Sequence, residues 1–600
     1  MCKVFVKKEA FISNELQYFP THTYTVTMAW NITWRKPHKK KYGYLKRSYR
    51  INGRVKTDEI YIGPDEVATK ILTDLATREL IDETDITYSG ETILEKIADS
   101  LDFEDILIKY TGDERASRAL KNVIILMTLF KESKRRLFLK RLDKSILKNS
   151  TDIKYLEEVY DLMDLVYKCL GDIMYDLLKN AIKQHKISLK YLMVDATRFK
   201  VYKDGETGLI KFGYSAQKRR DIPQVNLVLG VNEQQIPFFV SAHPGNTPDV
   251  TMFGDFLKTM RSKYQILNDS ARHKIIIVDQ GNVNEETIRY LRRLIRYNFH
   301  FLSMVRSSSI GRFAKNLDKS EMDLIYTRKI TKNKETRIYG KLVEAEVYGR
   351  VSHVLVCYNP DVKRTKNNSL DRRVEIVKQK VASLNKKGGS LDGKCDVVNS
   401  LIAKHNLKRA MEVIKNEKDG TIELVVDEED LNSRRKKFGF FALFTHCDMT
   451  PVEMIKVYKS RDLVEKGFQE LNTDFSVCPI MPCPAGSGID ESRRDSLRHS
   501  KDRRIETHTI FTVYGYFFVS ILRAILKGGG VEYSFRELLY TIKSGRSVVG
   551  YYEHDLWKEK QLYVNRPIKM SDELAEIFRI LKIEVPRYDV KLEPYPYNVE

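Results

Sequence analysis

The sequence has little of what marks fibrous, low-complexity or disulfide-bonded proteins. Only 30 of its 600 residues are Gly and 16 are Pro, which excludes collagen-like and Pro/Gly-rich chains. The seven cysteines are odd in number and form no Cys-x-x-Cys motif, so we expect no disulfide framework. Cys478 and Cys483 could be half of a zinc site, but no second Cys or His pair follows at the spacing of a zinc finger.

Long apolar runs are also scarce. The longest, Ile510 to Leu522, is shorter than the ~20 residues that a membrane span needs, so we expect a buried core helix there. The first residues, Met-Cys-Lys-Val-Phe-Val-Lys-Lys-Glu, lack the apolar region of a signal peptide. We therefore expect a cytoplasmic protein that has no membrane partner.

Acidic residues are too few to balance the basic ones. Lys and Arg number 103 against 81 Asp and Glu, which gives a net charge of +22. This excess favours a polyanionic partner, because a protein that neutralises phosphates releases their counterions. With 42% hydrophobic residues the chain can bury cores, and its 600 residues exceed the ~250–300 that one core holds. We expect several domains and a nucleic-acid partner.

Changes in hydrophobic periodicity along the chain predict six segments. Strand-like alternation around an Asn52-Gly53 turn comes first, helical periodicity follows, and strands that alternate with helices come next. The predicted segments are a β region with possible DNA contact (1–65), a helical domain with possible DNA binding (66–189), the first part of an α/β core (190–306), a β-rich insertion (307–437), the second part of the core (438–530) and a C-terminal tail region (531–600).

The first segment is unusually basic. Between Arg35 and Arg50 it holds eight Lys or Arg residues and no acid, with Trp and Tyr residues interleaved. Cations among aromatic rings suit contact with phosphates and bases, and we expect Lys39, Lys40 and Lys41 to bind DNA. The alternative is a solvated edge strand that its lysines protect from aggregation.

Two aspartates stand in or at the end of apolar strands. Asp195 follows Leu-Met-Val within one predicted strand, and Asp279 ends the strand Ile-Ile-Ile-Val. A carboxylate in such a position is costly to bury without a cation. The two could lie on neighbouring strands and coordinate one hard metal ion. Taken alone, each could instead be an aspartate that begins a turn or caps a helix.

A polar stripe follows near residue 460. Tyr458, Arg461, Glu465, Phe468 and Asn472 recur at i, i+3, i+7, i+10 and i+14. At ~100° per residue they fall within an arc of ~80°, so we expect them on one face of one helix. The simpler interpretation is a partly buried helix with an Arg–Glu pair. The sharper one is that Glu465 faces metal ions while Arg461 and Tyr458 hold a nucleic-acid phosphate.

Three motifs together resemble a known family. The Tyr-x2-Arg-x3-Glu pattern, preceded by Val-Asp-Ala-Thr-Arg-Phe and Ile-Val-Asp-Gln-Gly, is similar to the insertion-sequence DDE transposases with a ribonuclease-H-like core. It is most similar to the branch with a β-rich insertion before the Glu, and residues 213–225, 243–249 and 48–55 resemble further segments of that branch. The separation of 186 residues between Asp279 and Glu465 fits an insertion of the predicted size. Within residues 307–437, the segments 323–330 and 337–358 alternate like strands around a basic helical stretch, and we expect the whole insertion to lie outside the catalytic sheet.

The resemblance implies a fold and a chemistry. The fold is α/β, a ribonuclease-H-like mixed sheet with flanking helices that is interrupted by the β-rich insertion, plus an N-terminal β-hairpin region and a helical domain. The implied enzyme is a DDE transposase, a metal-dependent endonuclease and strand transferase that cleaves the ends of its own insertion sequence and joins them to target DNA. The resemblance places two Mg²⁺ or Mn²⁺ ions per active site on Asp195, Asp279 and Glu465, and places DNA on Tyr458, Arg461 and Asn472.

The implied partner is double-stranded DNA, both terminal inverted repeats and target, bound by a homodimer that is nucleoid-associated when on DNA. Two departures matter. The family has a Lys where this chain has Asn472, and Lys466 cannot replace that Lys because it points ~100° away from Glu465. The segment from Cys478 to Arg504 is also longer than the resemblance leads us to expect. Two alternatives therefore stand beside the transposase. One is an inactive or domesticated relative that only binds DNA, and the other is a ribonuclease-H-like nuclease without strand transfer.

Overall fold

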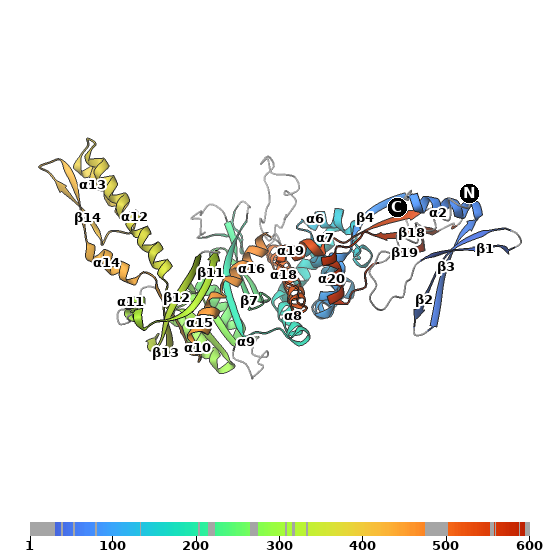
Figure 1. The fold of residues 1–600 in the computed structure, drawn as a ribbon, viewed down its shortest axis with the longest axis horizontal. Coiled ribbons are helices and arrows are strands. Elements are labelled where there is room, and N and C mark those ends of the chain that lie inside the picture. Colours follow the sequence, from blue (N-terminus) through green and yellow to red (C-terminus); the bar gives the residue numbers. More distant parts are fainter. Residues whose placement is uncertain are drawn as a thin grey trace. The chain divides into compact units, whose positions relative to one another are not determined.

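The computed structural model describes residues 30–37, 40–51, 54–77, 81–132, 134–201, 205–213, 223–263, 274–306, 309–314, 319–331, 334–473, 502–552, 557, 560–586 and 589–594. The chain separates into two compact units (Figure 1). Unit 1 consists of Met1–His185 and Glu470–Glu600, and unit 2 consists of Lys186–Gln469.

Unit 1 begins with a three-stranded antiparallel sheet. The strands are β1 (Asn31–Arg35), β2 (Tyr42–Ile51) and β3 (Arg54–Pro64), in the order β1-β2-β3. Helix α2 (Asp65–Thr77) follows and packs on one face of the sheet. The predicted Asn-Gly turn between β2 and β3 lies outside the described residues.

The centre of unit 1 is a bundle around one apolar helix. The helices are α3 (Ser89–Ser100), α4 (Phe103–Thr111), α5 (Glu114–Leu129), α6 (Lys134–Arg136), α7 (Leu156–Val166), α8 (Leu170–His185) and α18 (Asp502–Gly528). By length and composition α18 could cross a membrane, but 83% of its most apolar window is buried inside the protein. This agrees with the core helix expected over 510–522.

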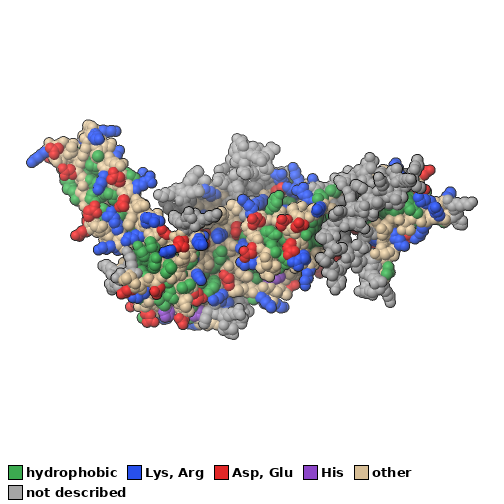
Figure 2. Space-filling view, in the orientation of Figure 1, with side chains coloured by type: hydrophobic (Ala, Val, Ile, Leu, Met, Phe, Trp, Pro, Cys, Tyr) green, Lys and Arg blue, Asp and Glu red, His purple; other side chains and the backbone are tan. Residues whose placement is uncertain are grey.

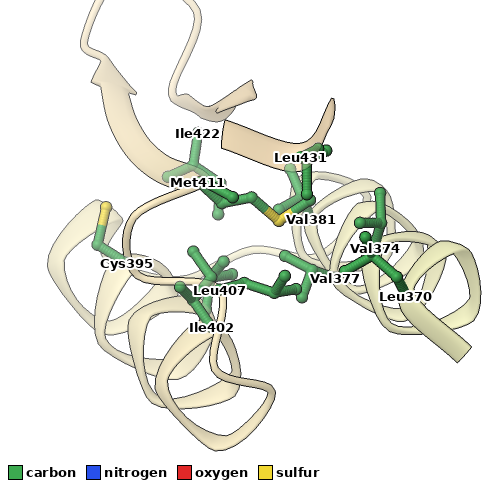
Figure 3. Close-up of a cluster of buried hydrophobic side chains, with 12 residues drawn as sticks. Leu370, Val374, Val377, Val381, Cys395, Ile402, Leu407, Met411, Ile422 and Leu431 are labelled. Atoms are coloured by element: carbon green, nitrogen blue, oxygen red, sulfur yellow. The ribbon is translucent and has the colours of Figure 1, made fainter. Parts of the chain in front are cut away.

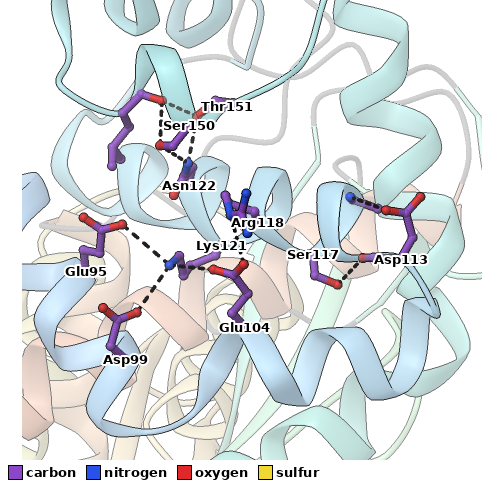
Figure 4. Close-up of polar contacts among 12 residues, drawn as sticks. Glu95, Asp99, Glu104, Asp113, Ser117, Arg118, Lys121, Asn122, Ser150 and Thr151 are labelled. Carbon is purple, nitrogen blue, oxygen red and sulfur yellow. Dashed lines mark hydrogen bonds and ion pairs between the residues drawn. The ribbon is translucent and has the colours of Figure 1, made fainter.

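A buried lysine joins three of these helices (Figure 4). The side chain of Lys121 on α5 is only 6% exposed, and its ammonium lies 2.8 Å from Glu104 of α4. Glu95 and Asp99 of α3 lie 3.6 and 3.3 Å away. Because three carboxylates surround it, the ammonium keeps its charge in a position where an unpaired cation would be costly.

Two arginines at the start of α18 fasten it to α7. Arg503 and Arg504 place their guanidinium groups 2.6 and 2.8 Å from the Asp164 carboxylate. Burial alone would raise the pKa of Asp164, but the two guanidinium groups lower it to about 2. A carboxyl whose pKa is depressed by folding stabilises the protein above its unfolded pKa of ~3.9. That stabilisation is lost as the pH falls toward 2.

We expect Asp164→Asn to remove this pH-dependent stability. At pH 7 the variant should lose about 1 kcal/mol of unfolding free energy, because water screens the partly exposed Arg503. At pH 2 the variant and the wild type should unfold at closely similar urea concentrations. Urea titrations at the two pH values measure the difference, and an equal loss at both would contradict the assignment.

Unit 1 also contains a second sheet. It has the order β19-β18-β17-β4, formed by β4 (Ile81–Thr87), β17 (Arg546–Tyr552), β18 (Lys560–Pro567) and β19 (Asp589–Pro594). Helices α19 (Phe535–Ile542) and α20 (Asp572–Leu581) accompany it. Because β17 pairs with β4 from the predicted helical domain, the C-terminal segment is built into the same unit as residues 81–87.

Unit 2 is built on a ten-stranded mixed sheet. Its first strands are β5 (Tyr191–Lys200), β6 (Lys211–Phe212), β7 (Pro223–Asn232), β8 (Pro237–Pro244), β9 (Lys274–Val278) and β10 (Phe299–Met304). Strands β5, β9 and β10 run parallel to one another, whereas β7 is antiparallel to β5. Helices α9 (Asp249–Ser262), α10 (Glu285–Leu294), α15 (Pro451–Lys459) and α16 (Asp462–Thr473) belong to the same α/β arrangement. The α/β class is as predicted.

The insertion contributes strands to this sheet. After α11 (Ile310–Ala314), β11 (Asp323–Thr331), β12 (Lys334–Val347) and β13 (Arg350–Tyr358) continue the sheet through β16 (Phe440–Thr445). The order is β11-β12-β13-β16-β10-β9-β5-β7-β6, and the tenth strand, β8, also pairs with β7. The expectation that residues 307–437 lie outside the catalytic sheet is therefore wrong. Six residue pairs join β13 to β16, from His353↔Thr445 to Tyr358↔Phe440.

What leaves the sheet is a largely helical module between β13 and β16, residues 359–439. It consists of α12 (Pro360–Asn385), α13 (Leu391–Lys404), β14 (Met411–Asn416), β15 (Thr421–Val426) and α14 (Glu428–Lys437). Figure 3 shows its own hydrophobic core, to which α12 contributes Leu370, Val374, Val377 and Val381. These positions lie on one face of the helix, because residues three and four apart are neighbours there.

Candidate active site

The register of two parallel strands brings Asp195 and Asp279 together. Strands β5 and β9 pair with Leu192 beside Ile276 and Met193 beside Ile277, a constant offset of 84 residues. The same offset separates the two aspartates, so Asp279, at the end of β9, continues this register beside Asp195. Neighbouring strands lie ~4.8 Å apart, which explains why the two carboxylates interact.

The polar stripe is placed by two helices instead of one. Helix α15 ends at Lys459 and α16 begins at Asp462, so Ser460 and Arg461 form a turn between them. The Ser460 hydroxyl donates to the Val457 carbonyl at 2.6 Å. Such a bond from a side chain competes with continuation of the helix. The expectation of one continuous helix is therefore wrong, although the break leaves Tyr458, Arg461 and Glu465 close together.

Arg461 is the cation at the centre of the site. One nitrogen of its guanidinium donates to Asp279 Oδ1 and lies 3.4 Å from the Tyr458 hydroxyl. The other nitrogen lies 3.4 Å from Glu465 Oε1. The guanidinium thus connects the aspartate that follows β9 with the glutamate in the first turn of α16.

Two of the carboxylates act on the third. The pKa of Asp195 is raised to about 6, chiefly by burial; Asp279 and Glu465 contribute to the rise, whereas the hydrogen bond from the Ala196 N–H and the charge of Arg461 oppose it. Burial likewise raises the pKa of Tyr458 to about 12. Burial and the two neighbouring carboxylates disfavour the charged form of Asp195. A bound cation would favour that charged form.

A second pair of motifs supports the end of β5. Arg198, near the end of β5, donates to Asp249, the first residue of α9, at 2.8 Å, and a turn that contains Gly245 precedes this helix. Within that turn, Gly245 packs so closely that an added Cβ would overlap the Gln224 carbonyl oxygen. The glycine of the Pro-Gly-Asn motif is therefore required by close backbone packing.

The residues present fit a hard divalent cation by their chemistry. Asp195, Asp279 and Glu465 are oxygen ligands of the kind that Mg²⁺ and Mn²⁺ prefer. As the side chains stand, however, no group of three His, Cys, Asp or Glu in the described part of the chain is arranged to hold a metal ion. Arg461 bonds to two of the three carboxylates, so it has to move for a metal ion to use both.

The other predicted DNA contacts lie apart from this group in the sequence. Asn472 is exposed on the last turn of α16. Lys40 is exposed, and Lys41 lies 3.2 Å from Asp65 and over the Trp34 ring at 3.8 Å. Lys39 lies outside the described residues, as do Cys478 and Cys483 of the imagined zinc site.

Sequence reasoning missed two features of this unit. It did not pair Arg461 with Asp279, although an unpaired aspartate at the end of an apolar strand signals a missing cation. It also missed a cavity of about 560 Å³, lined by Lys190, His300, His446 and Glu453 among others. That cavity lies near the starts of β5, β9 and β10, at the end of these strands away from Asp279.

Comparison with known proteins identifies this part of the chain. No curated protein matches the chain. Residues 188–477, which include all three acidic residues together with Tyr458, Arg461 and Asn472, match the family model described as the transposase DDE domain. The resemblance stated from the motifs is therefore confirmed for this part of the chain: residues 188–477 form a transposase DDE domain, which is similar to that of the insertion-sequence DDE transposases.

Proposed function

We propose that the protein cleaves the ends of its own insertion sequence and transfers them to target DNA, with Asp195, Asp279 and Glu465 as its catalytic carboxylates. One observation carries the proposal. Within the matched domain, strand register and a helix N-terminus place these three carboxylates around one guanidinium. The rise that Asp279 and Glu465 add to the pKa of Asp195 supports a shared cation site.

The three carboxylates would hold two Mg²⁺ or Mn²⁺ ions. When bound, such ions activate the attacking hydroxyl and stabilise the leaving oxygen of the phosphodiester. The sheet fixes Asp195 and Asp279, whereas Glu465 comes from a helix and is 56% exposed on its side chain. We propose that Glu465 is the ligand that adjusts its position, because the two aspartates are held by adjacent strands.

Arg461 would change partners during the reaction. While no other cation is bound, its guanidinium neutralises Asp279 and Glu465. Once metal ions supply that charge, the guanidinium is free to form a bidentate pair with a DNA phosphate. Tyr458 is only 7% exposed, and the Arg461 Cζ lies over its ring, 5.6 Å from the ring centre. We therefore assign Tyr458 to positioning Arg461 instead of to direct DNA contact.

Double-stranded DNA would be the partner, as terminal inverted repeats and as target. Two ends must be held together for transfer, so we propose a homodimer on DNA that acts in the cytoplasm at the nucleoid. The Asn472 side chain can donate a hydrogen bond to a phosphate but carries no charge. The electrostatic part of DNA binding must then come from lysines and arginines elsewhere in the chain.

A cleavage assay on the DNA that flanks the gene tests the proposal. The purified chain, a labelled duplex with the terminal inverted repeat and a supercoiled target plasmid are incubated with Mg²⁺. We expect cleavage at the repeat and covalent joining of its 3′ ends to the plasmid, both abolished by EDTA. Cleavage without joining would identify a nuclease, and binding without cleavage would identify an inactive relative.

A further inference from the structure

Among the described residues, the three-stranded sheet of unit 1 has one face that packs into a core and one face whose side chains are at least partly exposed. Leu45, Ile60 and Ile62 point into a core shared with α2 and with Trp557. Side chains alternate across a strand, so their neighbours stand on the opposite side. We call this side the outer face and define it by seven residues of β1, β2 and β3: Arg35, Tyr44, Lys46, Ser48, Thr57, Glu59 and Tyr61.

The outer face belongs to the most basic part of the chain. Residues 30–64 hold ten Lys or Arg and two acids, which is +8 of the total +22. Lys and Arg side chains gather over these strands in Figure 2. Part of this charge is matched within the protein: Arg47 on the inner face lies 2.8 and 2.7 Å from Asp58 and Asp589, and Arg35 on the outer face pairs with Glu59. The surplus charge favours a polyanion.

The aromatic rings of the outer face are not a stacking platform. Arg35 lies 4.6 Å from the Tyr44 ring centre, and Glu59 holds its guanidinium at 2.5 Å. The Tyr44 and Tyr61 rings are 5.2 Å apart and tilted by 47°. Because Arg35 covers Tyr44 and the rings tilt toward each other, they offer little flat surface to unstacked bases. This favours a duplex over single-stranded nucleic acid.

The dimensions of the sheet fit a DNA groove. Strand β2 has 10 residues and β3 has 11, which corresponds to ~33–36 Å, about one turn of B-DNA. Three strands span ~10 Å between their outer axes, against a major groove ~12 Å wide. The hydroxyls of Ser48 and Thr57 lie 3.0 Å apart on the outer face, where they can reach the edges of bases.

We propose that the outer face of β1–β3 enters the major groove of duplex DNA and reads base sequence there. Ser48 and Thr57 contact base edges, and Lys46 contacts a phosphate. That this duplex is the end of the mobile element rests on the proposed function. The binding itself needs neither the three carboxylates nor a metal ion.

The full-length chain in EDTA is first used to select from a random 30-base-pair duplex library. We expect an enriched motif of about one helical turn. Affinities for this motif, for a scrambled duplex and for its single strand are then measured by fluorescence anisotropy. The duplex motif should bind at least ~10-fold more tightly than the other two.

Lys46→Ala and Lys56→Ala form a matched pair for the salt dependence. Both lysines lie in the same hairpin. Lys56 is four residues from Ile60 along β3, so its side chain lies on the same inner side of the sheet as that of Ile60. Lys46→Ala should reduce the log–log salt slope by ~0.9 for all duplexes, and Lys56→Ala should leave it nearly unchanged. Equal slopes for the two variants would overturn the proposal.

Ser48→Ala with Thr57→Val tests base reading. The double variant should lose ~10-fold of its preference for the motif while its affinity for the scrambled duplex stays the same. Ser48→Thr with Thr57→Ser keeps both hydroxyls and should retain the preference. Thermal melting verifies that each variant is folded, and tighter binding of the single strand by the wild type would contradict the assignment.

These outcomes are separable from the proposed function. Motif binding through the outer face without Mg²⁺-dependent cleavage would leave this inference intact and refute the transposition chemistry. The opposite result is that the wild type cleaves DNA while the Lys46→Ala and hydroxyl variants bind the motif as the wild type does. That result would support the proposed function and refute this inference.

Discussion

Asp279→Asn should abolish DNA cleavage and leave DNA binding intact. The substitution keeps the shape of the side chain but removes the charge that would hold a metal ion beside Asp195. Loss of one such ligand removes several kcal/mol of transition-state stabilisation, or a decrease in rate on the order of 10³-fold. Asp195→Asn and Glu465→Gln should behave alike, and double variants should be little worse than single ones, because the group acts as a unit.

The measurement is Mg²⁺-dependent cleavage of the terminal repeat, with binding followed by anisotropy in EDTA. Asp255→Asn is the matched control, since this carboxylate is also partly exposed in unit 2 but pairs with Lys258 on α9. It should cleave at the wild-type rate. Wild-type cleavage by any of the three site variants would remove that residue from the proposed metal site.

Arg461→Ala should lower both the stability of the metal-free protein and the rate of DNA cleavage, for two different reasons. Without the guanidinium, Asp279 and Glu465 lose their common cation, and the metal-free protein should lose about 1 kcal/mol of stability because both carboxylates are partly exposed. Mg²⁺ should then raise the melting temperature of the variant more than that of the wild type. Cleavage should still fall by on the order of 10²-fold, because the phosphate loses a bidentate partner.

Melting curves with and without Mg²⁺ decide this point. Arg461→Lys keeps the charge and should melt like the wild type in the absence of metal, yet it should cleave poorly, since an ammonium cannot form the bidentate pair. If Mg²⁺ shifted the melting temperatures of all three proteins equally, Arg461 would not compete with the metal ion for these carboxylates.

Part of this site could be predicted from single residues. Asp195 and Asp279 each interrupt or end an apolar strand, and burial makes such carboxylates conspicuous in a sequence. What could not be predicted is that an offset of 84 residues is also the register of β5 on β9. Parallel pairing is settled by non-local contacts, which leave no mark in either strand alone.

The break between α15 and α16 shows a second limit. The 3.6-residue periodicity continues through Ser460 and Arg461, and neither residue is a strong helix breaker. The turn depends on a hydroxyl–carbonyl bond to Val457 and on the pairing of Arg461 with Asp279, which is distant in sequence. Periodicity therefore correctly grouped Tyr458, Arg461 and Glu465, but it assigned them to one helix, whereas they lie on α15, on the turn and on α16.

The insertion shows the same limit for strands. Alternating residues at 323–330 and 337–358 correctly indicated strands, but alternation does not say which neighbour a strand pairs with. The helical content of residues 359–439 was visible in part as a basic helical stretch, yet its separate core depends on contacts between α12 and β15 that span about 50 residues.

The pairing of Tyr358 with Phe440 has a consequence for how this chain can change in length. Strands β13 and β16 are the two arms of an ordinary antiparallel hairpin, and residues 359–439 occupy its tip. Chain gained or lost at a hairpin tip alters neither strand order nor register, and its entropic cost grows only slowly with length. The 81-residue excursion is thus a site where the chain can gain, exchange or lose a whole folded block while β13 and β16 keep their pairing and the three acidic residues keep their supporting strands and helix.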